Sequence, residues 1–136
     1  MDGRFEGNQL LLDLEISSPI SPDTIKAVYP FGIDTGFTND ICITYKEAFP
    51  LALSLVGVQE YTIADGSKVP FFECIGLVTY NGQKIPAPIS IRPSGSLLVG
   101  VNLLKKLGVK LEADFVNNTV KLFDSVSSKK GGTTTP

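Results

Sequence analysis

Two turn dipeptides, Asp65-Gly66 and Asn81-Gly82, constrain the fold of this chain more than any other feature of its sequence. Each stands between two β-rich apolar runs, and Asp-Gly and Asn-Gly are the pairs that tight hairpin turns favour. The centre of the chain is therefore predicted to form two consecutive antiparallel hairpins. Their strands are expected at 61–63, 69–72, 75–80 and 84–91.

Short strands and short helices are predicted on both sides of these hairpins. Alternation of Leu or Ile with polar residues at 10–16 is typical of a half-buried strand. Further strands are expected at 25–29, 31–35, 41–44, 97–99, 109–115 and 120–123, the last two joined through Asn117-Asn118. One helix is expected at 101–107, ended by Gly108. A second is expected within 45–55, with Thr44 as its N-cap and Pro50 limiting its length. These elements predict a mainly β domain of closed or partly closed barrel type.

The composition fits one folded domain followed by a polar tail. Hydrophobic residues make up 43% of the chain and charged residues 19%, which suits a normal core, and the domain is expected to span residues 1–124. Residues 125–136 are mainly Ser, Lys, Gly and Thr. They carry too little apolar surface to favour folding, so we expect a flexible tail.

Composition also argues against several functions. The net charge of -2, with both signs interspersed, gives no field that would attract a phosphate backbone, so no nucleic-acid partner is expected. No apolar stretch is long enough to span a bilayer and no secretory signal is recognisable, so no membrane partner is expected. The absence of histidine removes Ser-His and Cys-His nucleophile pairs and the commonest zinc ligand. No cofactor or metal is expected.

The two cysteines, Cys42 and Cys74, each stand within an apolar, strand-like run. Such positions favour buried, reduced thiols over a disulfide. Reduced thiols indicate a cytoplasmic protein.

Asp34-Thr35-Gly36 is the main candidate for a reactive site. It follows the apolar run 29–33 and so places a carboxylate where a strand is expected to enter the core, with no cationic neighbour in sequence. The tripeptide alone is a weak signal, and Asp34 can also be interpreted as a structural carboxylate bonded to the N–H groups of a turn. A chain without histidine or a metal cluster is left mainly with carboxylate chemistry, in which two adjacent carboxyl groups share one proton and act as base and acid.

The residues from Phe31 to Thr38, followed after a hairpin by Leu97 to Leu104, resemble the retropepsin-like aspartic proteases, especially their small single-domain microbial members. Members of this family have an apolar-apolar-Asp-Thr-Gly strand, a hairpin flap, and an apolar-apolar-Gly motif that leads into a short helix. Asp34 and Gly100 are 100 − 34 = 66 residues apart, a separation typical of the family. The resemblance covers residues 10–123 and implies a mainly β, closed-barrel acid-protease fold with one short C-terminal helix.

The resemblance further implies an aspartic endopeptidase that acts as a homodimer, because the chain contains only one Asp-Thr-Gly. Water would be activated between Asp34 and the Asp34 of a second copy, and the substrate would be an extended peptide. Thr35 would hydrogen-bond across the two-fold axis, and Gly36 would donate its N–H to the carboxylate. The flap would lie within 58–75, with Ala64, Asp65 and Gly66 at its turn. The candidates for walls of the cleft are Ile33, Phe37, Ile63, Ile91 and Leu98, which can also be interpreted as ordinary core residues.

Three positions depart from the better-known viral pattern. Phe37 stands where viral members carry Ala, and Val101 stands where they carry Arg, which removes a salt bridge and predicts a weaker dimer. Asp65-Gly66 replaces a glycine-rich flap tip, which predicts a shorter or less mobile flap. Either 10–16 or 120–123 is a candidate for the dimer interface.

The alternative interpretation is a non-catalytic module of the same fold that dimerises or binds peptides. The complete Asp-Thr-Gly favours catalysis, because a binding domain would tolerate Asn, Ser or Ala at these positions equally well.

Overall fold

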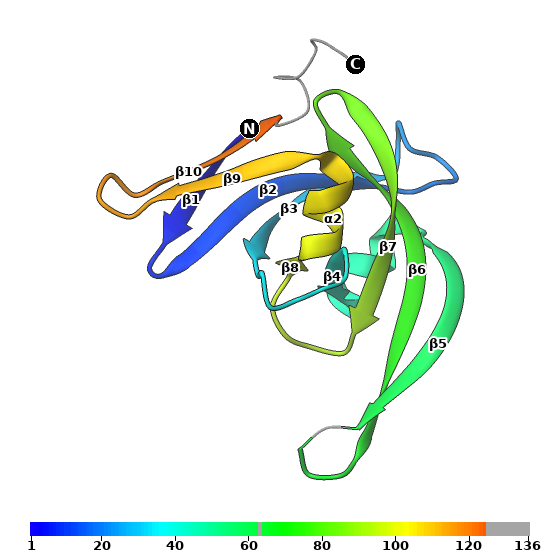
Figure 1. Ribbon diagram of the computed structural model, residues 1–136. Coiled ribbons are helices and arrows are strands. Elements are labelled where there is room, and N and C mark those ends of the chain that lie inside the picture. The colour runs from blue at the N-terminus through cyan, green and yellow to red at the C-terminus, as the bar shows by residue number, and fades with distance from the viewer. Residues whose placement is uncertain (63, 125–136) are drawn as a thin grey trace, which may run out of the picture.

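The computed structural model describes residues 1–62 and 64–124 (Figure 1). Ile63 and the predicted tail at 125–136 lie outside the described residues. The described elements, in chain order, are β1 (Asp2–Glu6), β2 (Gln9–Ser17), β3 (Lys26–Ile33), β4 (Ile41–Thr44), α1 (Tyr45–Ala48), the 3-10 turn η1 (Phe49–Leu51), β5 (Ser54–Thr62), β6 (Lys68–Tyr80), β7 (Gln83–Arg92), β8 (Leu98–Val99), α2 (Val101–Leu107), β9 (Val109–Asp114) and β10 (Thr119–Asp124).

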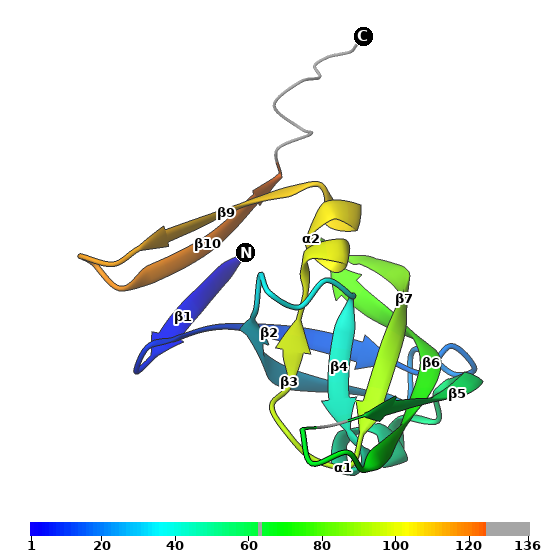
Figure 2. The same ribbon diagram turned by 60° about the horizontal axis from the view of Figure 1, so that its bottom comes forward.

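Six strands close into a barrel. Neighbours pair in the order β6-β7-β4-β8-β3-β2, and β2 then pairs with β6 again through Glu15 with Thr79, Ile16 with Val78, and Ser17 with Leu77. The remaining strands extend the sheet beyond the ring, with β5 beside β6, and β1, β10 and β9 beyond β2. Figure 1 shows these extensions as two arms that leave the barrel, one of them the β5–β6 hairpin, and Figure 2 shows the arm of β1, β9 and β10 from another side. The predicted mainly β, closed-barrel architecture is confirmed.

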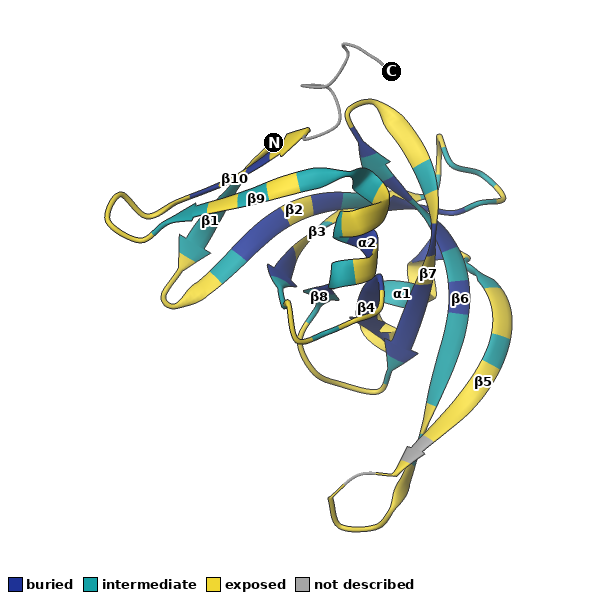
Figure 3. Ribbon diagram, viewed as in Figure 1, coloured by how far each residue is buried: buried dark blue, intermediate teal, exposed yellow. Residues whose placement is uncertain are grey.

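Side chains from all around the ring fill its interior. Leu12, Leu14 and Ile16 alternate on β2 with the half-buried or exposed Asp13 and Glu15, as their spacing predicted. The core is completed by residues of β3, β4, β7, β8 and α2, and the fully buried members include Phe31, Ile41, Ile43, Ile89, Val99 and Leu103. Figure 3 shows the burial concentrated in the barrel, whereas the projecting hairpin is mostly exposed. Burying each such side chain contributes on the order of 1.5–3 kcal/mol.

Both predicted hairpins are present. Asn81 and Gly82 adopt φ values of 51° and 77°, the left-handed conformation that a two-residue turn between Tyr80 and Gln83 requires. At the other turn, Asp65 accepts hydrogen bonds from the backbone N–H of Ser67 at 2.8 Å and from its hydroxyl at 2.6 Å. These bonds lower the pKa of Asp65. The two strands predicted at 69–72 and 75–80 form one strand, β6, which pairs with β5 on one side and β7 on the other.

The prediction of separate strands at 25–29 and 31–35 is wrong, because β3 runs through Pro30 without a break. Gly32 donates its N–H to the Leu97 carbonyl at 2.9 Å, on the β8 side of the strand. Backbone N–H directions alternate along a strand, so the nitrogen of Pro30, two residues earlier, also points away from β2. The missing N–H therefore breaks no bond between β2 and β3. The strand ends at Ile33, immediately before Asp34.

Two further differences concern short elements. The strand β1 was not predicted, because its sequence has no apolar alternation; it forms by pairing with both β2 and β10. The helix expected within 45–55 ends earlier, as α1 followed by η1, because Ala52 adopts a left-handed φ of 47° and β5 begins at Ser54. The N-cap at Thr44 is confirmed, as are α2 and its end at Gly108, which has a φ of 65°.

Both cysteines are free and buried, as predicted. Burial raises the pKa of the Cys42 thiol to about 11, and it also raises the pKa of Cys74. Both shifts favour the protonated form of the thiols. Within residues 1–62 and 64–124, no helix has the length and apolar character needed to cross a membrane.

Truncation of Leu103 should show how strongly α2 is held by the barrel. Leu103 is 0% exposed, so Leu103→Ala should lower the free energy of unfolding by about 2–5 kcal/mol, measured by denaturant titration. Leu55→Ala is the matched control, because Leu55 is 62% exposed and should change stability by less than about 0.5 kcal/mol. Equal losses in the two variants would contradict the packing described for α2.

Candidate active site

Asp34 is the first residue after β3, and its backbone is fixed on two sides. Its N–H donates to the Val99 carbonyl of β8 at 3.0 Å, and its own carbonyl accepts from the N–H of Phe37 at 3.0 Å. The Asp34 Oδ1 atom accepts the N–H of Gly36 at 2.9 Å. This is the hydrogen bond that the family resemblance implied for Gly36. The carboxylate is therefore held by a tight turn at the end of a barrel strand.

The Asp34 carboxylate is less buried than its sequence context predicted. Asp34 is half-buried, whereas Thr35 and Gly36 are exposed. The expectation of a carboxylate within the core is wrong for the single chain, because β3 ends one residue earlier and Asp34 lies in the following turn. No ion pair to Asp34 and no hydrogen bond from the Thr35 hydroxyl is found within residues 1–62 and 64–124. The turn thus presents a carboxylate and a hydroxyl at an open surface.

The loop that follows Asp34 is bound to the start of α2 by backbone hydrogen bonds. Val101 donates its N–H to the carbonyl of Phe37 at 2.9 Å, and Asn102 donates to the carbonyl of Thr38 at 3.2 Å. Gly100 donates to the carbonyl of Asp40 at 2.9 Å. These bonds use N–H groups that the first turn of a helix cannot bond internally. The segment around Gly100 therefore holds the loop that follows Asp34 in place.

Gly100 has no room for a side chain, because backbone carbonyls lie close to where a Cβ atom would be. A Cβ atom at this position would lie 2.2 Å from the Asn39 carbonyl oxygen and 2.4 Å from that of Phe37. Its φ of -112° is available to any residue, so close approach alone explains the glycine.

An ion pair fixes the far end of the same loop. Asp40 is 4% exposed, and its Oδ2 atom lies 2.7 Å from the ammonium group of Lys106 on α2. Removing Lys106 would leave a buried carboxylate without a counter-charge, which is strongly unfavourable. Neither residue was singled out from the sequence, and nothing there links two positions so far apart.

The structure places only some of the residues expected around Asp34 beside it. Ile33, Phe37 and Leu98 are half-buried beside the Asp34 turn, because β8 pairs with the end of β3. Ala64, Asp65 and Gly66 are exposed at the tip of the β5–β6 hairpin, and none of them hydrogen-bonds to the Asp34 turn. The expected hairpin residue Ile63 is outside the described residues.

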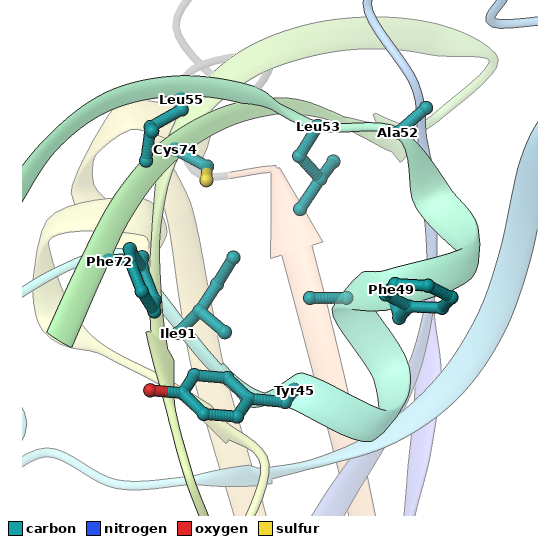
Figure 4. Close-up of a pocket in the computed structure, with 9 residues that line it drawn as sticks. Tyr45, Phe49, Ala52, Leu53, Leu55, Phe72, Cys74 and Ile91 are labelled. Atoms are coloured by element: carbon teal, nitrogen blue, oxygen red, sulfur yellow. The ribbon is translucent and has the colours of Figure 1, made fainter. Parts of the chain in front are cut away.

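Ile91 lies elsewhere, in the wall of an apolar pocket of about 310 Å³ (Figure 4). This pocket is bounded by α1, η1, β5, β6 and β7, and its lining residues are Tyr45, Ala48, Phe49, Ala52, Leu53, Leu55, Phe72, Cys74 and Ile91. The rings of Tyr45 and Phe72 are in contact, with centroids 5.6 Å apart. The pocket includes no residue of the Asp34 turn. Ile91 therefore lines a pocket to which the Asp34 turn does not contribute.

A second pocket, of about 280 Å³, lies where the loop after Asp34 meets the base of the hairpin. We call it the polar pocket; it is lined by Asn39, Asp40, Gln59, Glu73, Pro88, Ser90 and Asn102. Sequence reasoning missed these residues. Five separate segments contribute to it, so no local motif could have indicated them.

Within the described ranges, no group of three or more His, Cys, Asp or Glu side chains is placed to hold a metal ion.

Comparison with solved structures identifies the architecture. The EIAV protease complexed with the inhibitor HBY-793 matches with a TM-score of 0.56 and 17% sequence identity, over 78% of this chain and 94% of that chain. The retroviral protease-like domain of Ddi1 from Leishmania major matches with a TM-score of 0.49 and 12% identity, over 85% of this chain and 96% of that chain. No protein-family model and no curated protein matches this chain. The first match shows that the chain has the retropepsin-like fold.

A substitution at Gly100 should disturb the Asp34 loop without altering any reactive group. In Gly100→Ala, the added methyl group would displace two backbone carbonyls, and the free energy of unfolding should fall by about 1–3 kcal/mol. Thermal or denaturant unfolding would measure this loss. Gly57→Ala is the matched control, because a Cβ at Gly57 would meet no atom within 4 Å. A tolerated Gly100→Ala would contradict the close packing described here.

Proposed function

We propose that this chain is an aspartic endopeptidase that acts as a homodimer. The observation that carries the proposal is the placement of Asp34, held by Val99 and Gly36 at an open surface of a retropepsin-like barrel. Within the described ranges, no cation neutralises this carboxylate and no core packing explains it. A purely structural carboxylate would be expected to be buried among several donors or paired.

The chemistry requires two such carboxylates. One carboxylate is a poor catalyst for amide hydrolysis, but two within a few ångströms cannot both ionise easily and share one proton. The ionised member removes a proton from water as the water attacks the peptide carbonyl. The protonated member hydrogen-bonds to the carbonyl oxygen, and proton transfer to the nitrogen then releases the amine. Each chain offers one Asp34, so a two-fold dimer supplies the pair.

The exposed Asp34 turn supports this assembly. Thr35 and Gly36 are accessible to a second copy, and the Thr35 hydroxyl has no partner among the described residues, so it is available to bond across the two-fold axis. Approach of the second copy would also remove water from Asp34, which strengthens the coupling between the two carboxylates.

The proposed substrate is an extended peptide with apolar residues at the scissile bond. The β5–β6 hairpin projects from the barrel and would cover the peptide, which would bind by strand-like backbone hydrogen bonds. Ile33, Phe37 and Leu98 would form apolar walls beside Asp34. The two reduced thiols favour a cytoplasmic location.

Replacement of Asp34 tests catalysis. The wild type should cleave a library of extended peptides between about pH 3 and pH 7, where the carboxylate pair can hold one proton. Asp34→Asn should lower the rate at least a hundredfold, on the order of what loss of a general base removes. Mass spectrometry of the digests measures both.

Asp23→Asn is the matched control for Asp34→Asn, because it makes the same change at an exposed position. Equal turnover by the wild type and Asp34→Asn would contradict the proposal. Absence of cleavage by a dimeric wild type would favour the non-catalytic binding module.

Sharing of the site between two chains is a separate prediction. Sedimentation should show a monomer–dimer equilibrium, and cleavage per chain should rise with protein concentration until the dimer saturates. An excess of Asp34→Asn should inhibit the wild type, because mixed dimers carry only one Asp34. A monomer at concentrations up to about 1 mM, or activity that is unaffected by excess Asp34→Asn, would contradict the shared site.

A further inference from the structure

The polar pocket lies on the path that the proposed substrate would take. Asn39 and Asp40 belong to the loop that begins at Asp34, and Gln59 belongs to β5 of the hairpin that would cover a peptide. A peptide held between the Asp34 turn and this hairpin therefore passes the mouth of the pocket. Its side chains alternate in direction, so one of them can enter it.

The charge in this pocket is not balanced. The Asp40 carboxylate is paired with Lys106, as described above. Glu73 forms no ion pair among the described residues, and no Lys or Arg lines the pocket. The Ser90 hydroxyl lies 3.1 Å from both carboxylate oxygens of Glu73, but it has a single hydrogen to donate. Most of the acceptor capacity of Glu73 is therefore left for another donor.

The surrounding side chains add acceptors. Asn39 and Asn102 each carry an amide oxygen, and Ser90 is 6% exposed, so the pocket wall is polar at depth. An ammonium or guanidinium group would meet charge-assisted acceptors here. An apolar side chain would remove water from Glu73 without replacing its hydrogen bonds, which is unfavourable. The chemistry of the pocket thus favours one class of side chain and disfavours the other.

We propose that the polar pocket is a substrate subsite that selects a Lys or Arg side chain, with Glu73 as the residue that determines specificity. The inference rests on the proposed peptidase function and deepens it. Cleavage would then require apolar residues near the scissile bond and a basic residue at a fixed distance from it. Because a homodimer carries two copies of the pocket, the preference should arise on both sides of the scissile bond.

A positional-scanning peptide library would first locate the preferred position in the wild type. Two peptides that differ only there, one with Lys and one with the uncharged, unbranched norleucine, would then be compared under identical conditions. The kcat/KM for the Lys peptide should exceed that for the norleucine peptide at least tenfold, on the order of one charged hydrogen bond.

Glu73→Gln should bring this ratio close to one, whereas the control Glu112→Gln, on the exposed face of β9, should preserve it. The ratio is the informative quantity, since a merely structural defect would slow both peptides together. If Glu73→Gln does not fold, Asn39→Lys at an exposed position serves instead, because a cation at the pocket should repel the Lys peptide. A preference for apolar residues at every position, or a Lys preference that survives the pocket variant, would overturn the inference.

A binding measurement separates failure of this inference from failure of the proposed function. Fluorescence anisotropy of labelled Lys and norleucine peptides on Asp34→Asn protein, with and without Glu73→Gln, reports the pocket without any cleavage. Lys-selective binding that depends on Glu73 would support the subsite even if no peptide were hydrolysed. Equal binding of both peptides, or binding of neither, would refute it even if cleavage occurred.

Discussion

The two-residue strand β8 is the constraint on which the rest of this structure depends. It lies between β3, with which it pairs in parallel, and β4, with which it pairs antiparallel. Without it the ring of strands would be open between β3 and β4. The Val99 carbonyl of the same strand also fixes Asp34. The strand is followed by α2, and N–H groups at the start of α2 bond to the loop that follows Asp34. The same short strand thus closes the barrel and places the carboxylate.

This arrangement explains why Asp34 is ordered yet open. Several backbone hydrogen bonds, each contributing about 1 kcal/mol net, hold the turn in one conformation without covering it. A carboxylate that was enclosed by its own chain could not approach a second one closely. A carboxylate on an unanchored loop could not be positioned accurately against it. The observed turn meets both conditions, which is what a site shared between two chains requires.

The sequence predicted those features that depend on a few adjacent residues. Asn81-Gly82 needs two left-handed residues and Gly108 ends a helix, and both are recognisable locally. Continuity of β3 through Pro30 was not predictable, because it depends on which side of the strand lacks a hydrogen-bonding neighbour. The strand β1 exists only through its two partners. The polar pocket combines segments that meet only after the barrel has closed, so Glu73 looks like an ordinary strand residue in the sequence.

Backbone atoms position Asp34, whereas side chains line the polar pocket. This difference is relevant to the 17% sequence identity with a protein of the same fold. The contacts that place Asp34 are made by main-chain atoms of Phe37, Val99 and Val101, so they do not depend directly on the identity of these side chains, although Val99 is itself buried in the core. At position 100, lack of space restricts the residue to glycine. In the proposed peptidase, selection of a substrate would instead depend on side chains such as Glu73. The proposed catalytic geometry could therefore persist while specificity diverges, so the peptide that the proposed enzyme would choose must be inferred from the pockets of this chain rather than from its fold.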